Sequence, residues 1–299
     1  MSGAPTSQGP VAKAVIPAAG LGTRTLPASK AVPKEMMAVV DKPAIQYVVE
    51  EAVAAGLSEI VVVTGRGKQA LEDHFDSSPE LEAALEASGK QAELEAVRSL
   101  AGLARLCFVR QGRPLGLGHA VAQASPYLGG QPFAVLLPDD LLPAGPGLLR
   151  SMLDAHYRTG ASVLALQAVG PREISAYGAA RVEPDGQGLV RVVEVVEKPP
   201  PGQAPSDLAV MGRYVLTPGV LDALAKAEPG RGGEIQLTDA IGVLAGSEPV
   251  YGVVFSGPRH DVGSKLGYLQ ATVSLGLAHP EVGRDFRAWL AGLAAGLEA

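Results

Sequence analysis

Short, almost continuously apolar runs recur along the first half of the chain, and each ends in a loop that contains glycine or proline. They are residues 14–17 (AVIP), 60–65 (IVVVTG), 106–112 (LCFVRQG) and 133–140 (FAVLLPDD). A strand that is apolar at nearly every position is typical of a parallel sheet covered by helices on both faces. The runs therefore predict an α/β fold in which a mostly parallel sheet is flanked by helices.

The segments between and after these runs carry other patterns. Residues 42–56 (KPAIQYVVEEAVAAG) repeat apolar residues at the spacing of one helix face. Residues 77–104 are rich in Glu, Ala and Leu, which indicates one or two inserted helices. After residue 160, strand patterns joined by turns, including PDGQG at 184–188, predict an additional small β-region.

The chain shows no sharp linker and no internal repeat, so we expect one main domain with two flanking segments. Residues 1–10 are expected to be a disordered tail, and residues 11–290 a single domain. That domain has a first half at about 11–160 and a second half at about 161–270. Residues 271–299 are expected to form a helical tail, whose amphipathic end is suited to contact with another subunit.

Composition excludes several classes of protein. The formal net charge of −6 argues against a nucleic acid as main partner, although a few focused cations can still hold a small anion. The single cysteine, Cys107, excludes an internal disulfide and lies in an apolar run, where we expect it to be buried. No uncharged apolar run reaches the ~18 residues of a membrane-spanning helix, and the N-terminus lacks a signal-peptide pattern. We expect a cytoplasmic protein without nucleic-acid or membrane partners.

The first apolar run leads into a glycine-rich loop with several cations, KAVIPAAGLGTRTLPASKAVPKEM at residues 13–36. The GLGTRT segment lacks the third glycine of a dinucleotide-binding motif, and the loop contains no Walker sequence. Arg24 offers a fork of donors suited to phosphate oxygens, whereas Lys34 offers a point charge. Together with backbone N–H groups, these two cations are able to hold a triphosphate.

Asp139 lies where the fourth apolar run ends, at the edge of the sheet where ligands bind. Mg²⁺ prefers one or two carboxylates and keeps its other positions for phosphate and water, so Asp139 is a candidate metal ligand. Asp140 would point the opposite way along a strand, and we treat it as secondary. An acidic run of this kind is also similar to the metal-binding motif of glycosyltransferases, which keeps that class open.

Gln111 follows the third apolar run. Its amide is able to accept a hydrogen bond from N3–H of uracil and to donate to a ring carbonyl, whereas cytosine would leave the acceptor unpaired. The residues alone leave a surface-loop role for Gln111 open. His119, nearby in LGLGHAV, is expected to be structural or exposed to solvent.

Several stretches resemble, in the same order, the sequence blocks of the sugar-1-phosphate nucleotidylyltransferases. They are PAAGLGTRTLPASKAVPKEM, RQGRPLGLGHAV, LLPDD, SAYGAARV, VVEKP, SDLAVMGRYVL, GGEIQLTDAI and HDVGSKLGYLQA. The likeness covers about residues 12–290 and is greatest to the members that use UTP and glucose 1-phosphate. It implies a Rossmann-like sheet of the nucleotide-diphospho-sugar transferase type. One departure, Ala38 where many relatives carry proline, puts no catalytic residue in doubt.

The resemblance implies an activity. The chain would transfer the uridylyl group of UTP to glucose 1-phosphate, giving UDP-glucose and pyrophosphate, by Mg²⁺-assisted in-line attack without a covalent intermediate. It would do so as a homo-oligomer, a dimer or tetramer. A thymidylyltransferase, or a transferase for another sugar 1-phosphate, remains the main alternative. A glycosyltransferase and a non-catalytic sugar-nucleotide-binding regulator are less favoured.

The same resemblance assigns roles to individual residues. Glu197 would accept hydrogen bonds from glucose hydroxyls, and Lys198 would hold the sugar phosphate. Glu234 and Asp239 are equally suited to capping a helix and are left outside the site. The expected catalytic residues are Arg24, Lys34 and Asp139, the metal ligands Asp139 and Asp261, the nucleotide-binding residues Ala18, Ala19, Gly20, Leu21, Gly22, Thr23, Gln111 and Gly116, and the sugar-phosphate-binding residues Tyr177, Gly178, Glu197, Lys198 and Gly212.

Overall fold

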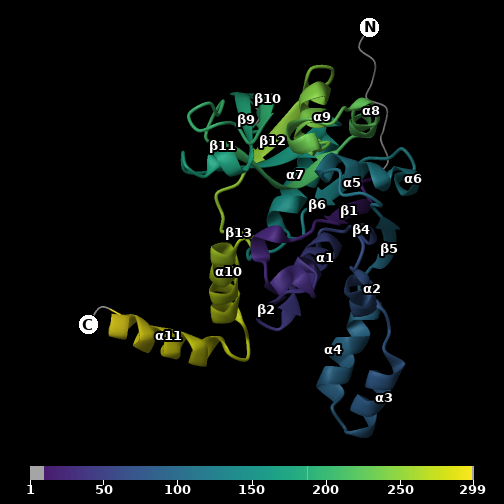
Figure 1. The fold of residues 1–299 in the computed structure, drawn as a ribbon, viewed down its shortest axis with the longest axis vertical. Helices are drawn as coiled ribbons and strands as arrows, with labels where there is room; N and C mark the ends of the chain where they lie inside the picture. Colours follow the sequence, from purple (N-terminus) through teal and green to yellow (C-terminus); the bar gives the residue numbers. More distant parts are fainter. Residues whose placement is uncertain (1–9, 187, 298–299) are drawn as a thin grey trace.

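The computed structural model describes residues 10–186 and 188–297, and a nine-stranded sheet lies at the centre of this part of the chain (Figure 1). The expected disordered tail at 1–10 therefore lies almost wholly outside the described residues. The sheet strands are β1 (Lys13–Ala18), β4 (Glu59–Thr64), β5 (Arg105–Arg110), β6 (Phe133–Leu136), β8 (Ser162–Ala168), β9 (Gly178–Pro184), β10 (Val190–Glu197), β11 (Leu208–Leu216) and β12 (Val250–Val254). Two short pairs join β2 (Ala38–Val39) to β3 (Lys42–Pro43) and β7 (Asp140–Leu141) to β13 (His260–Asp261).

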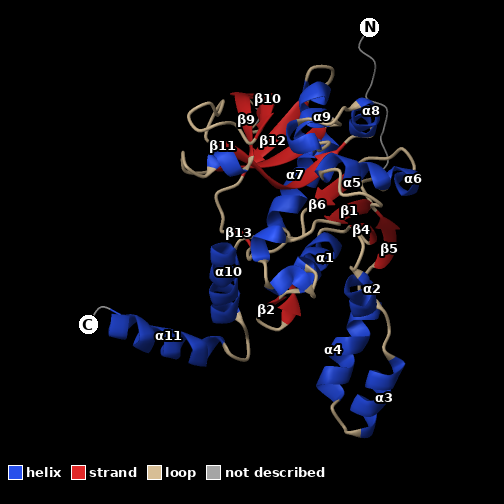
Figure 2. Cartoon of the chain, in the orientation of Figure 1, coloured by secondary structure: helices blue, strands red, loops and turns tan. Residues whose placement is uncertain are grey.

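Helices cover the sheet and also extend from it (Figure 2). The α-helices are α1 (Ala44–Ala54), α2 (Gln69–Phe75), α3 (Pro79–Ala87), α4 (Gln91–Ala101), α5 (Leu117–Gln123), α6 (Ser125–Leu128), α7 (Gly147–Thr159), α8 (Gly219–Lys226), α9 (Leu237–Ala245), α10 (Lys265–Ala278) and α11 (Gly283–Leu297). The 3₁₀ helices are η1 (Thr23–Thr25), η2 (Ala28–Lys30), η3 (Lys34–Met36), η4 (Ile174–Ala176) and η5 (Arg231–Gly233). None of the helices in the described part combines the length and apolar character needed to cross a membrane.

The sheet is mixed, with the strand order β5-β4-β1-β6-β11-β8-β12-β10-β9. Strands β5, β4, β1 and β6 pair in parallel, as expected for the first half of the chain. Strand β11 then lies antiparallel between β6 and β8, and only the β8–β12 pair beyond it is parallel. The α/β class with flanking helices is confirmed. Most of the parallel pairing lies among β5, β4, β1 and β6.

The apolar strands are explained by two separate cores, one on each face of the sheet. In β1, Ala14 and Ile16 pack in the core that includes α1 and α7, whereas Val15 packs in the core that includes α5, α8 and α9. Since successive strand residues point to opposite faces, each face demands its own apolar side chains. Burial on both sides therefore removes the polar alternation that a half-exposed strand would show.

Cys107 is half-buried, not buried as expected. Its strand, β5, forms one edge of the sheet, so one of its sides has no neighbouring strand to cover it. The apolar pattern of a strand reports burial of its faces but does not show whether the strand lies at an edge.

Two helical segments extend from the body of the molecule (Figure 1). Residues 77–104 form the helices α3 and α4, which pack against each other, in agreement with the expected one or two inserted helices. The C-terminal segment is helical, although its first helix, α10, begins at Lys265, before the expected bound of 271. Helix α10 is capped by Ser264, whose side chain accepts a hydrogen bond from Gly267 N–H, and α11 packs on α10 where Phe286 lies close to Gly276.

A buried ion pair joins α1 to β11. The guanidinium of Arg213 donates through Nε to Glu51 Oε1 at 3.0 Å and through Nη2 to Glu51 Oε2 at 2.7 Å, and its side chain is 1% exposed. Burial opposes the charge, but Glu51 outweighs it and raises the pKa of Arg213. The same guanidinium donates to the carbonyl oxygens of Leu137, Asp140 and Gly212.

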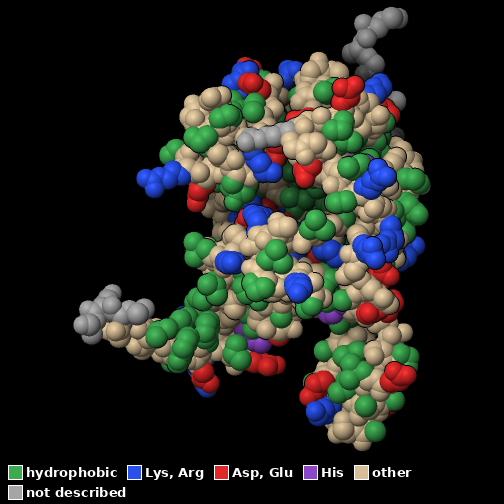
Figure 3. All heavy atoms as spheres, viewed as in Figure 1, with side chains coloured by type: hydrophobic (Ala, Val, Ile, Leu, Met, Phe, Trp, Pro, Cys, Tyr) green, Lys and Arg blue, Asp and Glu red, His purple; other side chains and the backbone are tan. Residues whose placement is uncertain are grey.

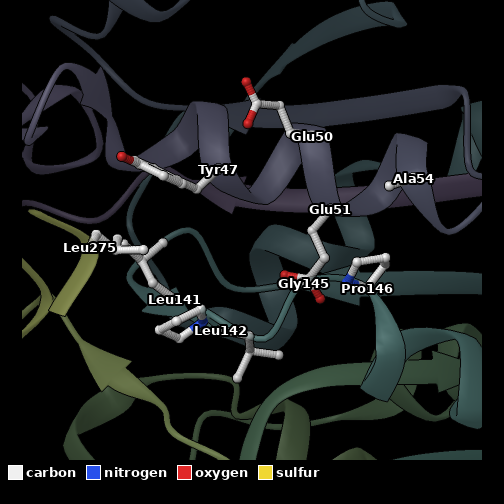
Figure 4. A pocket seen from close by; sticks show the side chains of 10 residues that line it. Tyr47, Glu50, Glu51, Ala54, Leu141, Leu142, Gly145, Pro146 and Leu275 are labelled. Carbon is white, nitrogen blue, oxygen red and sulfur yellow. The ribbon is translucent and has the colours of Figure 1, made fainter. Parts of the chain in front are cut away.

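This pair fixes the segment that follows β6. Figure 4 shows Glu51 pointing from α1 toward the chain after β7, where it borders a hollow of about 290 Å³ that contains none of the expected site residues. Because Arg213 donates to the carbonyl oxygens of Leu137 and Asp140, on either side of Asp139, it holds the loop that carries this residue.

Arg213→Met should destabilise the protein by about 3–5 kcal/mol, because it leaves the Glu51 carboxylate buried and unpaired. Adding Glu51→Leu to that variant should restore most of the loss, since the uncompensated charge is then gone. Urea unfolding of both variants measures this. A single variant as stable as the parent protein would show that the pair does not hold α1 against the sheet.

Candidate active site

Two adjoining hollows open beyond the ends of β1 and β6, on a face that Figure 3 shows recessed and bordered by charged side chains. The first hollow, of about 400 Å³, is lined by these expected residues: Ala19, Gly20, Leu21, Thr23, Lys34, Gln111, Gly116 and Asp139. The second, of about 480 Å³, is lined by Arg24, Asp139, Tyr177, Gly178, Glu197, Lys198, Gly212 and Asp261. The structure thus gathers most of the expected nucleotide residues around one hollow and the expected sugar-phosphate residues around the other, with Asp139 on the border.

Ala18 and Gly22, two of the expected nucleotide residues, line neither hollow. Ala18 is the last, buried residue of β1. Gly22 has φ of 67°, and a β-carbon there would lie 3.0 Å from that of Ser29. The hydroxyls of Thr25 and Ser29 both donate to the carbonyl oxygen of Gly22, at 2.9 and 2.6 Å. Gly22 therefore shapes the loop that carries Arg24.

Asp139 lies between the two cations of this loop. Lys34 Nζ is 2.6 Å from Asp139 Oδ2, and Arg24 Nη2 is 3.6 Å from the same oxygen. Burial opposes ionisation of Asp139, but Lys34 and Arg24 outweigh it and hold the pKa of this carboxyl below its ordinary value. Burial likewise disfavours the charged form of Lys34, yet Asp139 and Glu35 raise its pKa. Asp139 and Lys34 therefore form a charged pair at neutral pH.

A second ion pair fixes η3, which carries Lys34. The next residue, Glu35, accepts from Lys68 Nζ at 2.5 Å, with side chains 0% and 9% exposed. Lys68 precedes α2, so the pair ties η3 to the loop after β4. Glu35 and Lys68 were not among the expected residues, because nothing local in the sequence relates two such distant positions.

Asp139 and Asp261 are suited to hold a divalent cation together. Arg24 Nη1 donates to Asp261 Oδ2 at 3.1 Å, so one guanidinium spans both carboxylates. A β-carbon added to Gly263 would lie 2.8 Å from an Asp139 oxygen and 2.9 Å from an Asp261 oxygen, which shows how closely they converge. The described residues contain no group of three or more metal-ligating side chains, but Mg²⁺ needs only one or two carboxylates when phosphate completes its shell. The donor set therefore fits.

Gln111 lines the first hollow and is held in a defined orientation there. Its Nε2 donates to the carbonyl oxygen of Gly116 at 3.1 Å and lies 2.8 Å from His119 Nδ1. These contacts use the amide nitrogen and leave the amide oxygen available to accept from a ligand N–H. Gly116 has φ of 103°, and a β-carbon there would lie 2.6 Å from Ile235 O, so no other residue fits. His119, expected to be structural or exposed to solvent, is half-buried and contacts this amide.

Among the expected sugar-phosphate residues, Glu197 and Lys198 are linked to Tyr177 and to Thr238 of α9. Lys198 Nζ lies 3.1 Å from Glu197 Oε1, and Thr238 Oγ1 donates to Glu197 Oε2 at 2.8 Å. Lys198 N–H donates to the carbonyl oxygen of Tyr177 at 3.0 Å. Lys198 has φ of 43°, a strained region for a residue other than glycine, and such strain is typical of functional sites.

Gly178 and Gly212 were expected to bind the sugar phosphate, and packing within the protein also favours glycine at both positions. A β-carbon at Gly178 would lie 2.8 Å from Thr238 Cγ2, and one at Gly212 would lie 2.8 Å from Asp140 Oδ2. Both residues line the second hollow, so their packing fixes its wall.

Glu234 and Asp239 differ in what they do. The residue before α9 is Gln236, and no side chain caps the helix. Glu234 instead accepts from Gln236 Nε2 at 2.9 Å, and it lines both hollows although it was left out of the expected site. Asp239 lies in the first turn of α9, where a negative charge interacts favourably with the helix dipole.

Asp140 and Arg259 also line the second hollow. Asp140, which was treated as secondary, is buried and accepts from Gly212 N–H at 2.8 Å. Arg259 forms an ion pair with Asp140. The signal for Arg259 was its place in RHDVG, two residues before Asp261, which puts both on the same side of an extended segment.

Comparison with known proteins agrees with this geometry. A family model described as nucleotidyl transferase matches residues 13–276. The UTP–glucose-1-phosphate uridylyltransferase 1 of Staphylococcus saprophyticus is 49% identical over 267 residues, which cover 89% of this chain and 93% of that protein.

Solved structures share the fold as well. The UTP-bound UGPase from Acinetobacter baumannii matches with a TM-score of 0.83 at 41% identity, over 94% of this chain and 98% of that one. A UDP-glucose pyrophosphorylase complexed with UDP-glucose matches with a TM-score of 0.80 at 40% identity, over 89% of this chain and 98% of that one. The chain therefore belongs to the nucleotidyl transferase family, in the same group as the relatives named UTP–glucose-1-phosphate uridylyltransferase.

Proposed function

We propose that this protein transfers the uridylyl group of UTP to glucose 1-phosphate and releases UDP-glucose and pyrophosphate. One observation carries the proposal. Two hollows meet at Asp139, and its carboxylate is contacted by Lys34 of the first hollow and by Arg24 of the second. Relatives at 45–49% identity carry the same activity in their names. An oxidoreductase would need a dinucleotide loop, which the missing third glycine argues against.

The reaction needs positioning and charge neutralisation, and no general base. A phosphate oxygen of glucose 1-phosphate forms a bond to the α-phosphorus of UTP. The bond from that phosphorus to the bridging oxygen breaks, and pyrophosphate leaves with the electron pair. The attacking oxygen is already anionic, so the main obstacle is repulsion between the two phosphate groups. Arg24, Lys34 and Lys198 offset this repulsion from the two hollows.

We propose Mg²⁺ as the cofactor, held by Asp139 and Asp261. When bound, Mg²⁺ neutralises charge on the phosphates and helps to align them. Arg24 and Lys34 contact these carboxylates in the structure and also line the hollows proposed for the substrates. Their side chains are therefore able to exchange an aspartate contact for a phosphate contact when substrate binds.

Gln111 supports a uracil base in the first hollow. Its amide oxygen accepts from N3–H of uracil, and cytosine would leave that acceptor unpaired. Thymine also has N3–H, so Gln111 does not separate UTP from dTTP. A thymidylyltransferase remains the second candidate on that ground.

The purified protein should release pyrophosphate from UTP when glucose 1-phosphate and Mg²⁺ are both present, and excess chelator should stop the release. CTP should react at least about 100-fold more slowly, because its base cannot satisfy Gln111. A coupled pyrophosphate assay, repeated with dTTP and with galactose 1-phosphate, ranks the substrates. Tight binding of UTP and glucose 1-phosphate without any release would contradict a transferase.

Lys198→Ala should raise KM for glucose 1-phosphate by about tenfold or more and leave KM for UTP within about twofold, because Lys198 lies in the second hollow only. Lys226→Ala, which changes an exposed lysine of α8 away from both hollows, is the matched control and should change neither. Equal increases for the two substrates would contradict the division between the hollows.

We also propose that the protein is a cytoplasmic homo-oligomer. Large apolar side chains are exposed along α10 and α11, where Figure 3 shows an apolar row; they are Leu266, Leu269, Val273, Trp289 and Leu293. A second copy of the chain would cover this surface, which is unusual for a protein that remains monomeric. The single cysteine suits a reducing compartment.

Leu269→Glu should shift the protein toward the monomer, because Leu269 is 60% exposed on α10 and a charge there opposes burial in an interface. Leu81→Glu on α3, at 47% exposed, is the matched control and should leave the mass unchanged. Light scattering after size exclusion measures both. A parent protein that is monomeric at tens of micromolar would rule out this assembly.

A further inference from the structure

The proposed chemistry makes no use of a buried ion pair at the wall of the second hollow. Arg259 Nε donates to Asp140 Oδ1, and the two side chains are 11% and 5% exposed. Asp140 Oδ2 accepts from Gly212 N–H at 2.8 Å. One carboxylate therefore joins Arg259 to the strand β11, at the glycine that forms part of the hollow's wall.

The same guanidinium also holds an aromatic ring. Its central carbon lies 4.8 Å from the centre of the Tyr177 ring, a cation–π contact. Burial opposes the charge on Arg259, but Asp140 and Tyr177 outweigh it and raise its pKa. Tyr177 was expected to contact the sugar phosphate, and it lines the second hollow beside Arg259.

These contacts connect three segments that are distant in the sequence. Tyr177 lies between η4 and β9, Gly212 lies in β11, and Arg259 immediately precedes β13. Strand β13 pairs with β7, which places Asp261 opposite Asp140. The neighbouring residues Asp139 and Asp140 therefore serve two sides of one site. Asp139 contacts the cations at the border of the hollows, and Asp140 anchors the wall of the second.

We propose that Arg259 is a positioning residue for the sugar phosphate, which acts by holding the Tyr177 ring against the second hollow while Asp140 fixes Arg259 itself. This inference rests on the proposed function. Arginine suits this arrangement: its guanidinium donates to Asp140 while its central carbon lies over the Tyr177 ring, whereas a lysine ammonium is a point charge that neutralises Asp140 without spanning both partners. Arg259→Lys therefore separates ring positioning from simple charge compensation.

The test is a double-mutant cycle of Arg259→Lys and Tyr177→Leu. Each single variant should raise KM for glucose 1-phosphate by about tenfold and leave KM for UTP within about twofold. The double variant should be no worse than the poorer single variant, because both changes remove the same contact. Arg181→Lys changes an exposed arginine paired with Glu194 at 3.0 Å and should change neither constant.

The dissociation constant of glucose 1-phosphate, measured by calorimetry on each variant, gives the same comparison without turnover. If the parent protein binds the sugar phosphate but releases no pyrophosphate, the proposed function fails, and the binding cycle still decides the role of Arg259. If the parent protein does not bind it, both proposals are overturned. Independent, multiplying effects of the two changes, or equal effects on both substrates, would show that Arg259 only neutralises Asp140.

Discussion

The carboxylate of Asp139 lies between Lys34 and Arg24, and the site is organised around this contact. Burial alone would favour the protonated acid, but the two cations keep its pKa low and so keep the group available to a metal ion. The same contact brings the glycine loop after β1 against the loop after β6. This one interaction therefore keeps Asp139 ionised and also holds the loops after β1 and β6 together.

The rest of the fold supports that contact from both sides. Lys68 forms an ion pair with Glu35, the residue after Lys34, and so fixes the short helix η3 that carries both residues. Arg213 holds the carbonyl oxygens of the chain around Asp139 and is itself fixed by Glu51 of α1. Buried ion pairs of this kind contribute little net stability, but removing one partner is costly, so they restrict the conformations available to the loops.

Much of the site was accessible from the sequence, because residues at the ends of apolar strands meet at one edge of a sheet. Arg24, Lys34 and Asp139 could be selected on residue chemistry and position, and they do meet. Asp261 came from family resemblance alone, since its place depends on the pairing of β13 with β7, which no local pattern reveals. Arg259 was missed although its place in the sequence, two residues before Asp261, was a local signal.

The order of the strands in the sheet could not be predicted from the sequence, for a related reason. Nothing in the sequence of β11 shows that it inserts antiparallel between β6 and β8, yet this insertion brings Gly212 beside Asp140. Local patterns predict which segments are strands and which faces are buried. Long-range pairing decides which strands are neighbours and which lie at an edge, as at Cys107.

The central claim is that both substrates meet at Asp139 and react directly with each other, without a covalent intermediate. The stereochemical course at the α-phosphorus tests this, using UTP made chiral there by a sulfur atom. A single in-line displacement predicts that UDP-glucose forms with inverted configuration. Retention of configuration would show that the uridylyl group is first transferred to the protein, and would contradict the account.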